Sequence, residues 1–147
     1  MNDKTIINIW HLVLTEEDRK LVNDREHGGW DASPKLARYA SLTCMAKPAV
    51  AEAAFMHGDH TFVATVETDD LNEAYRLTNH ITESWQFNNG VTAVGEARTR
   101  AKSSSVGDIF EVIENGRSKF HVVTMHGFEE LDLGPHQHGC MKEGEQA

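Results

Sequence analysis

Basic residues and cysteines are both scarce in this chain of 147 residues. Lys and Arg number 14 against 23 Asp and Glu, which gives a net charge of −9 with neutral histidines. Because nonspecific nucleic-acid binding depends on Lys and Arg that neutralise phosphates, the composition argues against a nucleic-acid partner. The two cysteines, Cys44 and Cys140, lie far apart and give no disulfide framework, which favours a reducing cytoplasm.

Long apolar runs are also missing. No stretch approaches the roughly 20 apolar residues of a transmembrane helix, and the first residues lack a signal-peptide pattern. We therefore expect a cytoplasmic protein with no membrane partner. The length and the 39% apolar content fit one domain over residues 1–131. Residues 132–147 form a polar, glycine-containing tail that we expect to be disordered.

Local patterns in the first half predict a strand followed by helices. The apolar run 5–14 is rich in Ile and Val, which favours a buried strand. Thr15 is a suitable N-cap for a helix that ends near residue 26, because three acidic residues follow it. Ser33 and Pro34 are another helix-start signal, but residues 35–45 remain ambiguous between helix and strand. Pro48 then begins a short helix that ends near Gly58.

The second half carries clearer signals. Residues 61–68 alternate as a strand does, and an acidic pair at 69–70 caps the next helix, with Glu73 in capping-box position. Residues 91–94 begin another strand. Asn115-Gly116 joins the runs 108–113 and 119–124, and this dipeptide between alternating apolar segments is a strong hairpin signal.

This order of elements predicts an α+β fold. Residues 61–94 should form a right-handed strand–helix–strand unit whose helix covers one face of the sheet. With the first strand and the C-terminal β-hairpin, we expect a two-layer sandwich of ferredoxin-like type.

Two segments together resemble a known family. They are DDLNEAYRLTN (residues 69–79) and the stretch from SSSVGDIFEV to GFEEL (residues 103–131). The chain is similar here to small phage and plasmid proteins whose C-terminal part is a YodL-like domain. The likeness covers roughly residues 61–131. It implies an origin on a mobile element and a compact α/β domain, and it carries no activity or catalytic residues that could be transferred to this chain.

Candidate catalytic and metal-binding residues are few. Glu67 lies at the end of a predicted strand, where a carboxylate is more often simply exposed beside the helix cap; partial burial beside Tyr75 or His80 would instead suit it to act as an acid or base. His57, Asp59 and His60 place three potential metal ligands in four residues, although a polar turn before the strand at residue 61 is the simpler explanation. The tail has a second such pattern in His136, His138 and Cys140. We predict no metal and no cofactor.

Candidate binding residues gather before the hairpin. Backbone N–H groups at Ser103, Ser104 and Ser105 could face an anion, with charge added by Arg98 and Arg100. The P-loop spacing is absent, so a small-molecule ligand here is a weak hypothesis. The three tryptophans, Trp10, Trp30 and Trp85, are typical of packing in or at the edge of the core, and Trp85, which polar residues flank, is the one best placed to reach a ligand or partner.

Two classes of function fit these observations. The first is a phage- or plasmid-borne accessory protein that binds a host protein and blunts a defence or regulatory system. The second is a small phage enzyme, such as an S-adenosylmethionine lyase, with its site at a subunit interface and Glu67 and Tyr75 as catalytic residues; this is an analogy of element order alone. A free sheet edge would also allow a homo-oligomer.

Overall fold

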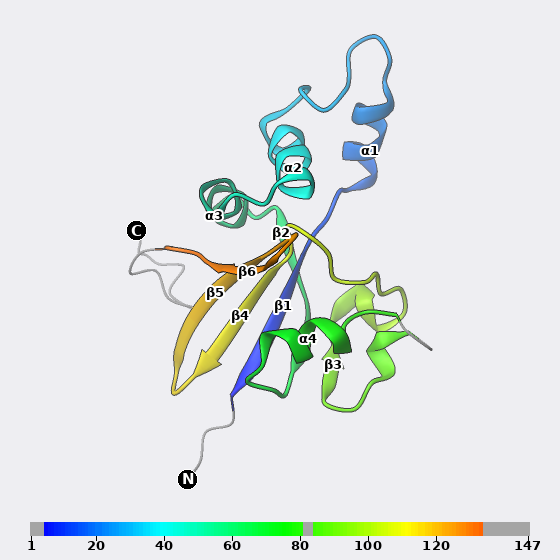
Figure 1. Ribbon diagram of the computed structural model, residues 1–147. Coiled ribbons are helices and arrows are strands. Elements are labelled where there is room, and N and C mark those ends of the chain that lie inside the picture. The colour runs from blue at the N-terminus through cyan, green and yellow to red at the C-terminus, as the bar shows by residue number, and fades with distance from the viewer. Residues whose placement is uncertain (1–4, 81–83, 134–147) are drawn as a thin grey trace.

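A six-stranded antiparallel sheet forms the centre of the protein in the computed structural model, which describes residues 5–80 and 84–133 (Figure 1). The strand order is β3-β2-β1-β4-β5-β6. The strands are β1 (Ile6–Leu12), β2 (His60–Val66), β3 (Val91–Ala93), β4 (Ile109–Glu114), β5 (Arg117–Thr124) and β6 (Gly127–Glu130). The helices are α1 (Glu16–Asn23), α2 (Pro34–Cys44), α3 (Pro48–Met56) and α4 (Leu71–Leu77), with the 3-10 turns η1 (Trp85–Phe87) and η2 (Gly95–Arg98).

Capping residues set the helix starts, largely as the sequence predicts. The Thr15 hydroxyl accepts from the Asp18 N–H, and the Asp18 carboxylate accepts from the Thr15 N–H, so α1 opens on a capping box. Ser33 caps α2 in the same way, which resolves the ambiguous segment 35–45 as helix. Asp70 caps α4, but Glu73 pairs with Arg76 and does not complete a capping box.

The last three strands form a meander. Asn115 (φ 54°) and Gly116 (φ 76°) adopt the left-handed backbone that a tight hairpin turn requires, so the predicted β4–β5 hairpin is confirmed. A further strand, β6, pairs with β5 and was not predicted. Its four residues Gly127–Glu130 are too short to show an alternating pattern.

Helices cover both faces of the sheet, so the expected two-layer sandwich is wrong. One core cluster joins Ile9 and Phe110 of the sheet to Ala74 of α4. The other joins Ile109 and Phe120 to helices α2 and α3, through buried residues Leu42, Ala51 and Ala54. Successive residues of a strand point to opposite faces, and both faces are apolar here because both are covered.

The α+β class is confirmed, whereas the sheet differs from a ferredoxin-like one. In a split β-α-β unit, another strand separates the two strands that a helix connects. Here α1, α2 and α3 connect β1 to β2, and these strands are direct antiparallel neighbours. Strands β2 and β3, on either side of α4, are also antiparallel neighbours. The right-handedness predicted for the unit over residues 61–94 applies to parallel strands and is therefore wrong here, whereas its helix α4 does cover one face of the sheet. The described helices include none long and apolar enough to cross a bilayer.

Candidate functional site

A buried polar cluster fixes the loop between η2 and β4 (residues 99–108) to the sheet. The His11 ring nitrogen Nε2 lies 3.0 Å from the Ser104 hydroxyl, which lies 2.8 Å from the Thr78 hydroxyl. Asp108 accepts from the Leu12 N–H and the Ser105 N–H, both at 2.8 Å. Because these partners come from β1, α4 and the loop itself, the cluster joins three segments that are distant in the sequence.

Burial sets the charge of this cluster. Desolvation lowers the pKa of His11 to about 3, helped by the nearby Lys102 ammonium, so the ring is neutral at pH 7. Its 3.7 Å approach to the Asp108 carboxylate is consequently no ion pair. Desolvation also raises the pKa of Asp108 to about 6, against the opposing effect of Lys102 at 3.5 Å. Serine, histidine and carboxylate thus meet, but all three are buried and serve as internal partners.

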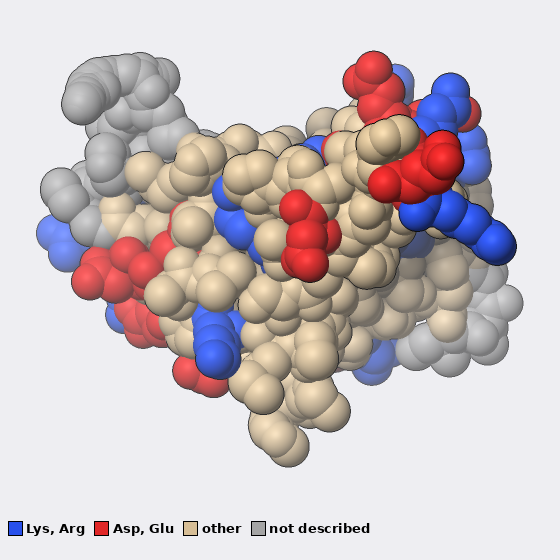
Figure 2. Space-filling view, turned by 90° about the horizontal axis from the view of Figure 1, so that it is seen from above, with Lys and Arg blue, Asp and Glu red and all other residues tan. Residues whose placement is uncertain are grey.

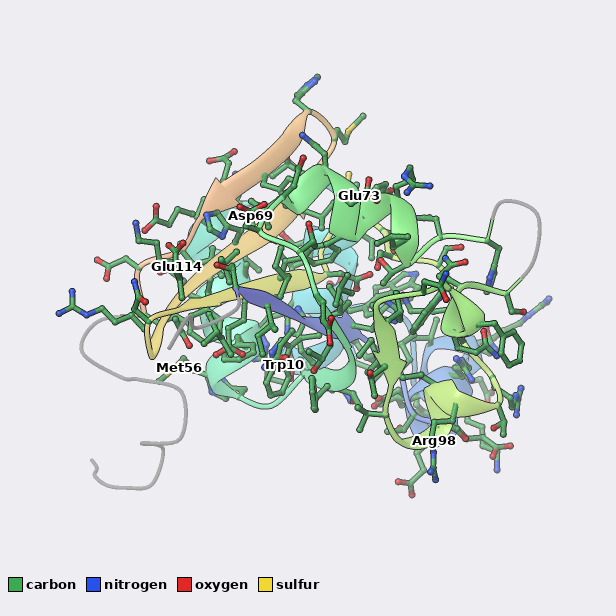
Figure 3. The ribbon with its side chains drawn as sticks, turned by 90° about the horizontal axis from the view of Figure 1, so that it is seen from below. Trp10, Met56, Asp69, Glu73, Arg98 and Glu114 are labelled. Atoms are coloured by element: carbon green, nitrogen blue, oxygen red, sulfur yellow. The ribbon has the colours of Figure 1, made fainter. Side chains whose placement is uncertain are left out.

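The three predicted anion-binding serines have different environments. Ser104 is buried within the cluster, and the Ser103 hydroxyl accepts from the His80 N–H at 3.0 Å. The Ser105 N–H points to Asp108. Arg98 and Arg100 are exposed, and Figure 3 shows Arg98 on the far side of the molecule from Glu114. Their proposed ligand stays a prediction.

Trp85 is the clearest correction to the expected binding residues. Its ring has no exposed surface, and its indole N–H donates to the Lys102 carbonyl at 2.7 Å. The ring packs in the core cluster on the α4 face. In this structure the Trp85 ring therefore cannot contact a ligand or partner directly. Its polar neighbours in the sequence do not make the ring itself accessible.

The structure does not unite Glu67 with Tyr75. Glu67 is exposed and lines an open hollow of about 390 Å³ with Thr5, Thr68 and Asp69. Tyr75 lies on α4 with its ring centroid 6.4 Å from those of Phe110 and Phe128. Glu67 thus lies at the rim of this hollow and Tyr75 packs near the core, so a catalytic role for the pair remains a prediction.

The three histidine-loop residues point to separate partners. Asp59 binds the Arg38 guanidinium through two hydrogen bonds, at 2.7 and 3.1 Å. His60 hydrogen-bonds to the Gly107 carbonyl through Nε2 at 2.9 Å, and His57 contacts the Ala53 carbonyl at 2.8 Å. Over residues 5–80 and 84–133, no group of three or more His, Cys, Asp or Glu side chains could hold a metal. The tail pattern of His136, His138 and Cys140 lies outside the described residues.

Sequence reasoning missed an exposed surface on α2 and α3. The side of α3 opposite the sheet consists of Ala49, Glu52, Ala53 and Met56, which we call the outer face of α3. The inner side buries Ala51 and Ala54. Helix α3 is thus apolar on nearly every side, a composition typical of helices covered all round. The signal is visible in the segment PAVAEAAFM, which carries one charged residue in nine.

The surface of α2 beside α3 is similarly poor in charge. Its outward positions carry Ala37, Ala40, Ser41 and Cys44. Met45 between the helices is 60% exposed and Met56 is 55% exposed. Seen from this side, uncharged side chains cover most of the surface, one acidic group lies near the middle with basic atoms beside it, and further acidic groups lie toward the margins (Figure 2). This arrangement has the composition of a contact surface, since charge is depleted at the centres of protein interfaces.

Comparison with known proteins adds no relative. No protein-family model, curated protein or solved structure matches this chain. The resemblance to the YodL-like domain therefore stays a prediction.

Proposed function

We propose that this chain is a phage- or plasmid-borne accessory protein that acts by binding a host protein, with a counter-defence or regulatory effect. The observation that carries the proposal is the outer face of α3. This face is apolar at three of its four positions although the helix already buries its opposite side in the core. An exposed apolar face beside exposed methionines is a common feature of protein-binding surfaces.

The S-adenosylmethionine lyase hypothesis has weaker support. The hollow that Glu67 lines is open to solvent, and its lining residues Thr5, Glu67, Thr68 and Asp69 do not include Tyr75. A lyase would consume S-adenosylmethionine and would lose activity in Glu67→Gln with the fold retained. The binding proposal expects no such consumption by the wild type.

A pull-down with matched variants tests the proposed function. The tagged full chain, Met56→Asp and Phe87→Asp are each incubated with a bacterial lysate, and retained proteins are identified by mass spectrometry. Phe87 is 69% exposed on η1, so its variant places the same charge on another apolar surface residue. We expect one host protein to be retained reproducibly, to bind the purified chain directly, and to be lost with Met56→Asp alone. The absence of any reproducible partner would contradict the proposal.

A further inference from the structure

We infer that the outer face of α3 docks a basic amphipathic segment of the partner protein, with apolar side chains on the helix and a Lys or Arg beside Glu52. This inference rests on the proposed binding function and names the chemistry of the partner. It has two parts, an apolar contact and an acidic position at its centre.

The apolar contact follows from helical spacing. Residues 49, 52, 53 and 56 stand at positions i, i+3, i+4 and i+7, which share one face of a helix. Ala49 and Ala53 are small and let another backbone approach closely. Met56 adds a flexible thioether that adapts to different partners. A helix laid along such a stripe is a recurring mode of peptide recognition.

The acidic position is Glu52, in the middle of this stripe. Its carboxylate accepts the Asp132 N–H at 2.6 Å, which holds it beside the end of β6. Asp132 and Glu129 are exposed and continue the acidic border on that side, because Glu129 lies opposite Val122 on the sheet face that α3 covers. Fixed carboxylates bordering an apolar stripe favour a partner of opposite charge.

The basic residues near this surface change the balance little. Lys35 pairs with Asp18 at 2.7 Å and Arg38 pairs with Asp59 at 2.7 Å. Lys47 is exposed, but it stands at the N-terminal end of α3 and outside the stripe. A basic segment would therefore meet net negative charge along the length of the helix.

Other occupants fit the same face less well. A second copy related by a two-fold axis through the face would place Glu52 opposite its own equivalent, because Glu52 lies near the centre of the stripe. The chain's net charge of −9 adds to that repulsion. The chain's own residues 134–147 also suit this face poorly. They carry two acidic residues against one lysine, and Met141 is their one large apolar side chain. Anionic lipid headgroups would be repelled by the same carboxylates.

A labelled model peptide tests the chemistry directly. The probe is an amphipathic helical peptide of Leu and Lys, about 14 residues long, and its counterpart has Glu in place of Lys. Fluorescence anisotropy measures binding of each to the purified full chain. We expect saturable 1:1 binding of the Leu–Lys peptide and at least about tenfold weaker binding of the Leu–Glu peptide.

Matched variants separate docking at this face from diffuse attraction. Glu52→Gln removes one charge but keeps an acceptor for the Asp132 N–H, and Glu96→Gln makes the same change on η2, on the other side of the sheet. We expect Glu52→Gln to weaken binding about fivefold and Met56→Asp at least about tenfold. Glu96→Gln and Phe87→Asp should stay within about twofold of the wild type. Circular dichroism confirms that each variant is folded.

Several outcomes would overturn the inference. Equal weakening by Glu52→Gln and Glu96→Gln would indicate nonspecific electrostatic attraction. A dimer in analytical ultracentrifugation that Met56→Asp dissociates would assign the face to a second copy, and binding to anionic vesicles would assign it to a membrane. If a host protein is retained equally by the wild type and Met56→Asp, the docking face is wrong while the binding function stands. If no host protein is retained, the function itself fails.

Discussion

Adjacent serines in the loop before β4 have different structural roles. The Ser104 hydroxyl is buried between His11 and Thr78, whereas Ser105 is exposed and contributes its backbone N–H to Asp108. In the sequence the three serines look equivalent. The residues that distinguish them, His11 of β1 and Thr78 at the end of α4, lie far from them along the chain. The local run therefore predicts a polar loop but not which hydroxyl is structural.

Replacing Ser104 tests this assignment. Ser104→Ala removes the partner of the His11 Nε2 atom and of the Thr78 hydroxyl, and we expect a loss of about 1–2 kcal/mol in unfolding free energy. Ser105→Ala is the matched control and should change it by less than about 0.5 kcal/mol. Urea unfolding followed by circular dichroism measures both. Equal effects of the two substitutions would contradict the structural role of Ser104.

Buried titratable residues should make the stability depend on pH. Burial lowers the pKa of His11 from 6.5 to about 3 and that of His60 from 6.5 to about 4. As the pH falls below 6.5, both rings take up a proton in the unfolded protein but not in the folded one. They therefore lower the free energy of unfolding as the pH falls. Burial raises the pKa of Asp108 from 3.8 to about 6, which has the opposite effect over this range. Desolvation also lowers the pKa of His121, so between about pH 6 and 4 the histidines outweigh the one aspartate by at least about one proton.

The unfolding free energy should then fall by roughly 1 kcal/mol for each pH unit between 6 and 4. His60→Gln removes one of these histidines, after which the effects of His11 and Asp108 nearly cancel and only the contribution of His121 remains, so the slope should become clearly shallower. Urea titrations at pH 7, 6, 5 and about 4.5 measure the slope. His126→Gln, at an exposed position, should keep the wild-type slope. An unchanged slope in His60→Gln would show that acid sensitivity arises elsewhere.

At the scale of elements, local chemistry predicts where helices and turns begin and end better than it predicts which strands pair. The capping residues Thr15 and Asp70 and the turn Asn115-Gly116 all lie where the sequence places them. These signals act over three or four residues. In contrast, β1 pairs with both β2 and β4, and its contacts with β4 link residues about a hundred positions apart. No short pattern specifies such pairing, which explains why the expected ferredoxin-like order is wrong.

The outer face of α3 shows a similar limit. The segment PAVAEAAFM predicts a helix, but its apolar residues do not indicate which side meets the sheet. Only the packing of Ala51 and Ala54 against the core reveals that Ala49 and Met56 face outward. The candidate binding surface therefore becomes visible once the fold is known.

At Gly107 the loop before β4 passes close to β1 and α2. Its φ is +97°, and an added Cβ would lie 3.3 Å from both the Leu12 Cδ2 and Leu42 Cβ atoms. Gly116 also has positive φ, but an added Cβ would meet nothing within 4 Å. We expect Gly116→Ala to cost about 1 kcal/mol from backbone strain. Gly107→Ala should cost at least about 1 kcal/mol more, because Leu12 and Leu42 must move.

Urea unfolding of the two glycine variants measures this difference. Both substitutions carry the same change in unfolded-chain entropy, so the comparison isolates the packing contribution. Equal losses in the two variants would show that Leu12 and Leu42 adjust without cost.

For the whole molecule, the sheet edges give little support to the predicted homo-oligomer. β3 has three residues and β6 has four, and short edge strands disfavour pairing between chains. The Val91 N–H already donates to the Asn88 carbonyl at the β3 edge. At the β6 edge, Glu129 and Glu130 would bring like charges together in a second copy. An edge-to-edge dimer is thus less favourable than the sequence suggested.

The molecule also divides into a well-buried centre and a weakly attached extension. Strands β1 and β4 lie inside the sheet with strands on both sides, and residues such as Ile9 and Phe110 are fully buried. Helix α1 has no buried residue and stands apart from the sheet (Figure 1). An ion pair between Asp18 and Lys35 links it to α2, and a pair this exposed contributes little stability.

Hydrogen exchange should therefore reveal two stabilities within one chain. Backbone amides of β1 and β4 should exchange only on global unfolding, whereas those of α1 should exchange at least about a hundredfold faster through local opening. Mass spectrometry of peptic fragments measures both regions in one experiment. Low concentrations of urea should accelerate exchange in β1 and leave α1 nearly unchanged, because local opening exposes little surface. If α1 exchanged as slowly as β1, it would have to be covered in solution, and Leu21→Ala should then accelerate its exchange by uncovering it.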